Sequence, residues 1–182
     1  MNTLEVMFDQ ENFTKVVSIL KDALFGTSNS SKKPQMLIIQ GSGGNGKTYF
    51  MNYLKQSFPS QIFQALSSVL LPSTSIQSLD DFEQREAMIE SLKSKRIVWM
   101  QMNESKNIDS ASFKDLISTN NNTQFVMICN TLPTFGGIEI NKLVEVGDAG
   151  LFARITVAEC SKTSVADVRT SDIKKAIECL CV

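Results

Sequence analysis

Four glycines, one lysine and one threonine lie close together in QGSGGNGKTYF, residues 40–50. Gly41, Gly46, Lys47 and Thr48 fit the spacing G-x-x-x-x-G-K-[ST] of a phosphate-binding loop. Phosphate oxygens need several backbone N–H donors that converge on one point, and glycine allows this without side-chain collisions. An apolar stretch precedes the loop and a helix is expected after it, so the segment predicts nucleotide binding. The alternative is a flexible glycine turn.

The side chains of this loop have separate expected roles. Lys47 would reach the outer phosphates, and Thr48 would offer its hydroxyl group to a magnesium ion. ATP and Mg²⁺ are the expected cofactors. The residues expected to hold the nucleotide are Gly41, Gly43, Gly44, Asn45, Gly46, Lys47 and Thr48.

A nucleotide hydrolase also needs an acidic residue at the end of a neighbouring strand. Glu104 follows the apolar segment RIVWMQM and is the candidate for this catalytic role and, with Thr48, for magnesium binding. Asn103 stands where a first acid is usual. An amide can orient a magnesium-bound water but brings no charge, so Glu104 must carry both tasks. The alternative is that Glu104 is only a polar residue after a buried strand.

Asn130 ends the next apolar segment, QFVMICN. A polar amide at the end of a buried strand beside the phosphate site could align the attacking water or sense the γ-phosphate. The other interpretation is a turn asparagine before Leu132 and Pro133, which is a common role for asparagine. The residues alone leave both open.

The elements that must position these residues follow from the apolar pattern. Residues 10–24 predict an amphipathic helix, which Asp9 caps and Gly26 ends. Strands that alternate with helices predict an α/β fold with a mainly parallel sheet and right-handed crossovers. The strands are expected at 35–40, 62–66, 96–102, 124–130 and 151–159, the further helices at 79–92, 110–117 and 171–180, and a loop at 67–78.

Length and composition narrow the class of protein. The 182 residues suit one compact domain, which we divide into an N-terminal helix and linker, 1–33, and a P-loop ATPase domain, 34–182. The chain has no histidine and its four cysteines form no C-x-x-C pair, which argues against zinc. A net charge of −1 indicates no general affinity for nucleic acid. Without a signal peptide or an apolar run of membrane-spanning length, we expect no membrane partner, no secretion and an intracellular location.

Four segments in order, GSGGNGKT, VWMQMNES, ICNTLP and DAGLFARITV, resemble the core of superfamily 3 helicases. These viral and plasmid ATPases include parvovirus nonstructural proteins and poxvirus-type primase-helicases, and the G-G-N-G-K-[ST] form of the loop looks like the poxvirus-type branch. The resemblance covers residues 36–157. It assigns Walker A to Lys47 and Thr48, the Walker B glutamate to Glu104, the sensor to Asn130 and the arginine before the last strand to Arg154.

The resemblance also implies an architecture and partners. It implies an AAA-like three-layer fold around a five-stranded sheet, and rings, usually hexamers, that move on nucleic acid. For viral and plasmid proteins of this kind, the expected location is the cytoplasm or a host nucleus. Arg154 would then act in trans on the γ-phosphate bound by a neighbouring subunit. The alternative for Arg154 is a surface ion pair with Asp148 or Glu145.

One segment departs from the helicase pattern. The family has a basic hairpin between the Walker B and sensor strands, whereas here the expected tip, STNNNTQ, has no lysine or arginine, and Lys114 is the nearest cation. This departure favours an ATP-binding scaffold subunit as the alternative function.

The motifs taken together predict a Mg-dependent ATPase with a nucleic-acid motor function. A P-loop kinase should show several arginines after the sensor strand, where this chain has only Arg154 and Arg169.

Overall fold

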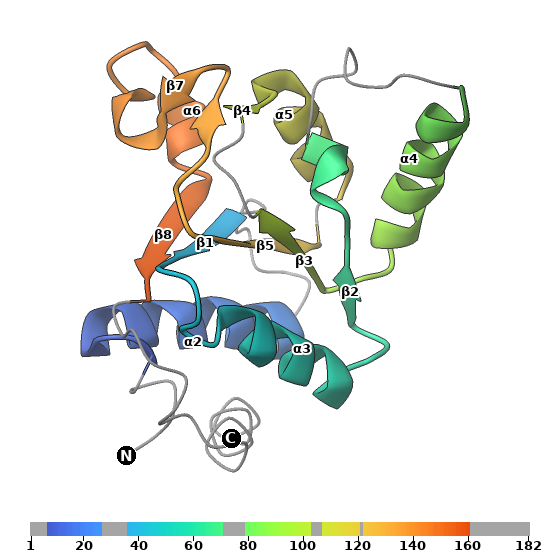
Figure 1. The fold of residues 1–182 in the computed structure, drawn as a ribbon. Helices are drawn as coiled ribbons and strands as arrows, with labels where there is room; N and C mark the ends of the chain where they lie inside the picture. Colours follow the sequence, from blue (N-terminus) through green and yellow to red (C-terminus); the bar gives the residue numbers. More distant parts are fainter. Residues whose placement is uncertain (1–6, 27–35, 71–78, 103–106, 121, 161–182) are drawn as a thin grey trace.

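The computed structural model describes residues 7–26, 36–70, 79–102, 107–120 and 122–160. Five parallel strands form the central sheet in the order β2-β3-β5-β1-β8. Helices cover both of its faces, which gives three layers (Figure 1). The strands are β1 (Met36–Gln40), β2 (Ile62–Gln64), β3 (Ile97–Met102), β5 (Gln124–Cys129) and β8 (Ile155–Glu159).

Among the described residues, one face of the sheet is covered by α2 (Gln10–Phe25) and α3 (Lys47–Ser57). Their buried side chains pack against alternate residues of the strands, such as Leu37 and Ile39 of β1. The intervening residues of β1, Met36 and Ile38, face the opposite core. Because a strand alternates its side chains between two faces, a strand buried on both sides must be apolar throughout, as MLIIQ nearly is.

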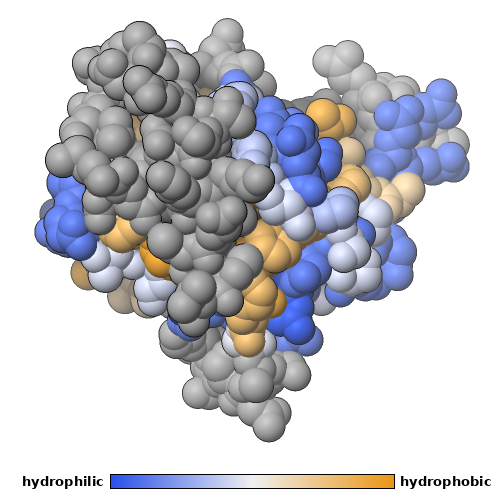
Figure 2. Space-filling view, turned by 90° about the horizontal axis from the view of Figure 1, so that it is seen from below, coloured by the Kyte–Doolittle hydropathy of each residue, from blue (hydrophilic) through white to orange (hydrophobic). Residues whose placement is uncertain are grey.

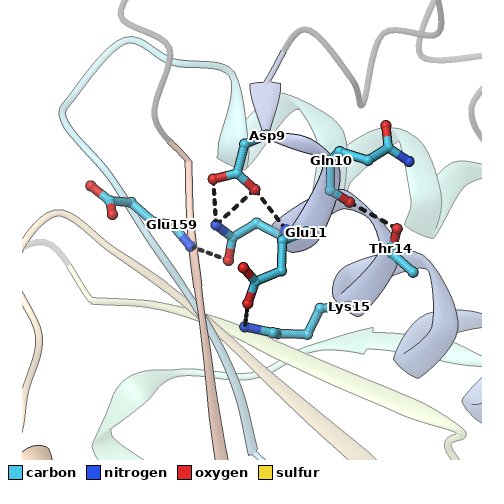
Figure 3. Close-up of polar contacts among 7 residues, drawn as sticks. Asp9, Gln10, Glu11, Thr14, Lys15 and Glu159 are labelled. Carbon is cyan, nitrogen blue, oxygen red and sulfur yellow. Dashed lines mark hydrogen bonds and ion pairs between the residues drawn. The ribbon is translucent and has the colours of Figure 1, made fainter.

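The predicted N-terminal helix is confirmed together with its caps. The Asp9 carboxylate accepts a hydrogen bond from the Asn12 backbone N–H at 2.7 Å, and Gly26 ends the helix. The Asn12 side chain in turn accepts from the Glu159 backbone N–H at 3.1 Å (Figure 3), so the start of α2 is fixed to the end of β8. On the side of the molecule where α2 and α3 lie, the outer surface shows apolar residues grouped between hydrophilic ones (Figure 2).

The second face carries the remaining helices and a small sheet (Figure 1). The sequence predicted α4 with the same bounds and α5 as a slightly shorter helix. It did not predict the three-stranded sheet β4-β6-β7, in which Phe135 of β6 packs edge-on against Phe113 of α5. These elements are η1 (Ser67–Leu70), α4 (Leu79–Leu92), β4 (Asn107–Ile108), α5 (Ser110–Thr119), β6 (Thr134–Phe135), β7 (Ile138–Glu139), η3 (Ile140–Lys142) and α6 (Ala149–Phe152).

Two expectations need correction. Residues 151–159 are not one strand: the Asp148 carboxylate caps the short helix α6 by accepting from the Leu151 N–H at 3.3 Å, and β8 begins only at Ile155. Asn120 is not a hairpin tip but the buried C-cap of α5, and its side chain donates to the Leu116 carbonyl at 2.8 Å.

Of the other expected elements, some are confirmed in part and one lies outside the described residues. The strand expected at 62–66 is confirmed but ends at Gln64, and the expected loop at 67–78 begins with a 3₁₀ turn. The expected closing helix at 171–180 lies outside the described residues. Within the described part of the chain, no helix is both long and apolar enough to cross a membrane.

Candidate nucleotide-binding site

The glycine-rich loop joins the end of β1 to the start of α3, on the side of the sheet where the C-terminal ends of all five parallel strands lie. A cavity of about 320 Å³ opens there. The ends of β3 and β5 form its other wall, because β5 lies directly beside β1 and β3 follows β5 in the sheet. The residues that line the cavity are Gly43, Gly44, Asn45, Gly46, Lys47, Thr48, Tyr49, Gln101, Met102, Ile128, Cys129 and Asn130.

Glycine is required at two points of the loop for different reasons. Gly46 has φ of 86°, a left-handed conformation that other residues rarely adopt, and it leads directly into α3. The loop is closely packed beneath it, since the Met7 Cε atom lies 3.8 Å from where a Cβ of residue 46 would stand. At Gly41, a Cβ would come within 2.4 Å of Asn45 Nδ2 and 2.5 Å of the Cys160 carbonyl oxygen.

Lys47 turns its ammonium group into the loop, and only 6% of the residue is exposed. Its Nζ donates to the carbonyl oxygens of Gly41 at 2.6 Å and Ser42 at 2.9 Å, and to Asn45 Oδ1 at 2.8 Å. Burial holds the pKa of Lys47 below its ordinary value of 10.5. The site therefore contains a cation fixed among loop oxygens at the N-terminus of a helix, where anions are favoured.

Two cysteines lie beside this lysine, Cys129 at the end of β5 and Cys160 just after β8. Both are buried, and burial raises the pKa of Cys129 to about 11. A thiol with such a pKa stays protonated at neutral pH, so Cys129 is an inert part of the cavity wall.

Thr48 lies at the first turn of α3, and its Oγ1 donates to Gln101 Oε1 at 3.3 Å. Gln101 was not predicted from the sequence. The signal was present in IVWMQM, where this exposed amide interrupts a strand whose other residues are buried. A polar residue near the end of a strand that ends at the same edge as the loop lies within reach of a loop side chain.

Asn130 follows β5 and is exposed toward the cavity. Its Oδ1 lies 3.4 Å from Lys47 Nζ, a long hydrogen bond. The structure thus brings Asn130 together with the loop lysine, as its position after a neighbouring strand predicted.

Glu104 and Asn103 lie outside the described residues, so the proposed catalytic acid has no described position. The described lining of the cavity contains no carboxylate. Nor do the residues that the structure describes contain a group of three or more histidine, cysteine, aspartate or glutamate side chains that could hold a metal ion. Magnesium at this site would depend on neutral oxygen donors and on Glu104.

Arg154 lies far from this cavity. It immediately precedes β8, whose first residue pairs with Met36 at the start of β1. Arg154 therefore lies at the N-terminal ends of the strands, whereas the glycine-rich loop lies at their C-terminal ends. There it lines a second cavity of about 350 Å³ together with Lys114 and Asp148. Asp148 pairs with Lys114 at 2.9 Å, and no ion pair joins Arg154 to another described residue. The alternative for Arg154, a surface ion pair with Asp148 or Glu145, is therefore not found among the described residues, where Asp148 pairs with Lys114.

Comparisons with known proteins give a likeness of fold. No protein-family model and no curated protein matches the sequence. An apo structure of the C-terminal region of NrS-1 is similar with a TM-score of 0.56 and 14% identity, over 98% of this chain and 41% of that one. A DNA replication initiation factor is similar with a TM-score of 0.52 and 14% identity, over 96% of this chain and 53% of that one. This chain therefore spans about half or less of each.

The central sheet, its helices and these neighbours agree on the architecture. At 14% identity the likeness extends to the fold and not to the activity. The chain has the α/β fold of P-loop NTPases, with the mainly parallel five-stranded sheet and the AAA-like three layers that the sequence predicted.

Proposed function

We propose that this chain binds and hydrolyses Mg-ATP and uses it, as superfamily 3 helicases do, to move on nucleic acid during viral or plasmid replication. The observation that carries the proposal is the Lys47 ammonium, fixed among loop oxygens between the end of β1 and the first turn of α3. This is the place where a triphosphate would meet both the positive end of a helix and a fixed cation.

The side chains that face the cavity suit a magnesium ion. Mg²⁺ prefers oxygen ligands and usually keeps several waters. Thr48 Oγ1 and Gln101 Oε1 are such donors, 3.3 Å apart, and Thr48 with Glu104 would hold the ion. Bound magnesium would neutralise charge on the outer phosphates. In this proposal Glu104 polarises the attacking water and Asn130 orients it.

The replication role and the oligomeric ring are each supported by one observation. One solved structure of similar fold is a DNA replication initiation factor. Within this chain, Arg154 lies at the N-terminal ends of the strands, on the side of the sheet opposite the loop. In a ring, one subunit could present this arginine to the nucleotide bound by its neighbour. A homo-oligomeric ring, which we propose to be a hexamer, would place the Arg154 side of one subunit against the glycine-rich loop of the next.

The experiment that tests the function is an ATPase assay with and without single-stranded DNA and single-stranded RNA. The motor proposal expects stimulation by one of them. Hydrolysis that neither strand stimulates would favour the second candidate, an ATP-binding scaffold subunit. That candidate is supported by Asn103, an uncharged residue at the position where a first acidic residue is usual. Failure to bind Mg-ATP would contradict both.

Glu104→Gln is expected to bind Mg-ATP normally but to hydrolyse it at least about tenfold more slowly, because a general base is typically worth ~10²–10⁴ in rate. Single-turnover hydrolysis and a binding titration would separate the two effects. Asp109→Asn is the matched control: the Asp109 carboxylate accepts from the Ser112 N–H at 2.7 Å and caps α5. A normal rate in Glu104→Gln would mean that the catalytic acid lies elsewhere.

A further inference from the structure

The Asn45 side chain lies inside the phosphate-binding loop, and only 3% of the residue is exposed. Its Oδ1 accepts from Lys47 Nζ at 2.8 Å, and its Nδ2 donates to the Cys160 carbonyl oxygen at 3.4 Å. One amide therefore contacts two groups that are 113 positions apart in the sequence. The orientation of the amide is fixed, because only Nδ2 can face a carbonyl and only Oδ1 can face an ammonium.

The Cys160 carbonyl is itself held in place. The Cys160 backbone N–H donates to the Gln40 carbonyl at 2.7 Å, which extends the pairing of β8 with β1 by one residue. Gln40 is the last residue of β1, so a continuous series of hydrogen bonds runs from the sheet through Cys160 and Asn45 to Lys47. The ammonium is thereby positioned by the sheet as well as by its own loop.

The loop is shaped around this amide. A Cβ at residue 41 would stand 2.4 Å from Asn45 Nδ2, so the glycine leaves the space that the Asn45 side chain fills. Two of the three short contacts of the ammonium are with backbone carbonyls, and Asn45 supplies the third. A lysine side chain is long and flexible, and burying its charge is costly unless its hydrogen bonds are satisfied.

We propose that Asn45 is a positioning residue that acts through Lys47: its amide holds the ammonium where it meets the outer phosphates and anchors the loop to the end of β8. This deepens the proposed function and rests on it. Asn45 was expected to contact the nucleotide as part of the loop. Its buried side-chain amide contacts two protein partners in the structure, and a contact of this residue with the nucleotide stays a prediction.

The first test is a double-mutant cycle on unfolding in the absence of nucleotide. The four proteins are the natural chain, Asn45→Ala, Lys47→Met and the double variant. Asn45→Ala is expected to lower the melting temperature by several degrees in the protein that keeps Lys47. In the Lys47→Met background the same substitution should lower it by clearly less, because no buried ammonium then loses a hydrogen-bond partner. Asn52→Ala, which removes an exposed asparagine of α3, is the matched control.

The second test is affinity for inorganic tripolyphosphate and Mg-ATP by calorimetric titration. Asn45→Ala is expected to weaken both by a similar factor of about ten, since the misplaced ammonium affects the phosphates and not the nucleoside. If that variant does not fold, Asn45→Asp replaces it. The carboxylate can accept from Lys47 but cannot donate to Cys160, and it brings negative charge toward the phosphates, so weaker binding is again expected.

Equal melting losses in both Lys47 backgrounds would mean that Asn45 only supports the loop, which would overturn the proposal. Natural affinity for tripolyphosphate in the Asn45 variants would overturn it as well. A natural chain that binds neither tripolyphosphate nor Mg-ATP would remove the proposed function, and with it the role toward phosphates. The melting cycle would still report separately whether Asn45 and Lys47 are coupled.

Discussion

Lys47→Ala is expected to lower the affinity for Mg-ATP by about a hundredfold or more. Hydrogen bonds to a charged group contribute about 1.5–3 kcal/mol each, and the ammonium can give at least two to the outer phosphates. The glycine loop and the first turn of α3 remain in the variant, so weak binding through backbone N–H groups should persist. A titration with Mg-ATP measures the loss directly.

The control for this substitution is Lys55→Ala, which removes a lysine from the last turn of the same helix, about two turns away from the loop. Circular dichroism of both variants shows whether each is folded. Unchanged affinity in folded Lys47→Ala would refute the assignment of the loop as the nucleotide site.

Arg154→Ala is expected to reduce ATP hydrolysis by about a thousandfold, the effect typical of an arginine that meets charge on the γ-phosphate. Geometry dictates that any such contact is made in trans. β1 and β8 are parallel, with Met36 beside Ile155 and Gln40 beside Glu159. Arg154 therefore precedes one end of a five-residue strand and the loop follows the other end, about 20 Å apart along the strands.

A mixing experiment distinguishes action in trans from a structural role. Arg154→Ala and Lys47→Ala should each be nearly inactive alone. Mixed oligomers contain some seams that pair an intact loop with an intact arginine, so part of the activity should return and should rise with protein concentration. Lys114→Ala, which removes the other cation of the second cavity, is the matched control. No recovery in demonstrably mixed oligomers, or full activity of Arg154→Ala alone, would leave Arg154 with a structural role.

Most of the central fold was predictable because its signals are local. Apolar periodicity and the caps at Asp9 and Gly26 define α2, and continuous apolar runs define β1, β3 and β5. The three-stranded sheet was missed because strands of two residues have no periodicity to detect. Residues 151–153 are apolar like a strand, but the cap at Asp148 places 151 and 152 in a helix instead.

Some features of the candidate site also follow from local sequence, whereas others depend on how distant segments pack together. The loop motif and Asn130 could be predicted, the first from spacing and the second from its place after an apolar strand. Gln101 and the contact between Asn45 and Cys160 depend on strand order, which brings together residues 53 and 115 positions apart. Nothing in the local sequence shows that β8 lies beside β1. Glu104 remains a prediction from the sequence.

The packing of Met7 against Gly46 has a practical consequence for expressing shortened versions of the protein. Met7 is 1% exposed and lies beneath the loop, although it precedes α2 in the sequence. A fragment that begins at Phe8 would leave this side of the loop uncovered and lose about 1.5–3 kcal/mol of apolar burial. Such a fragment could keep its sheet and helices and still understate nucleotide affinity, so the start of the expressed chain belongs upstream of Met7.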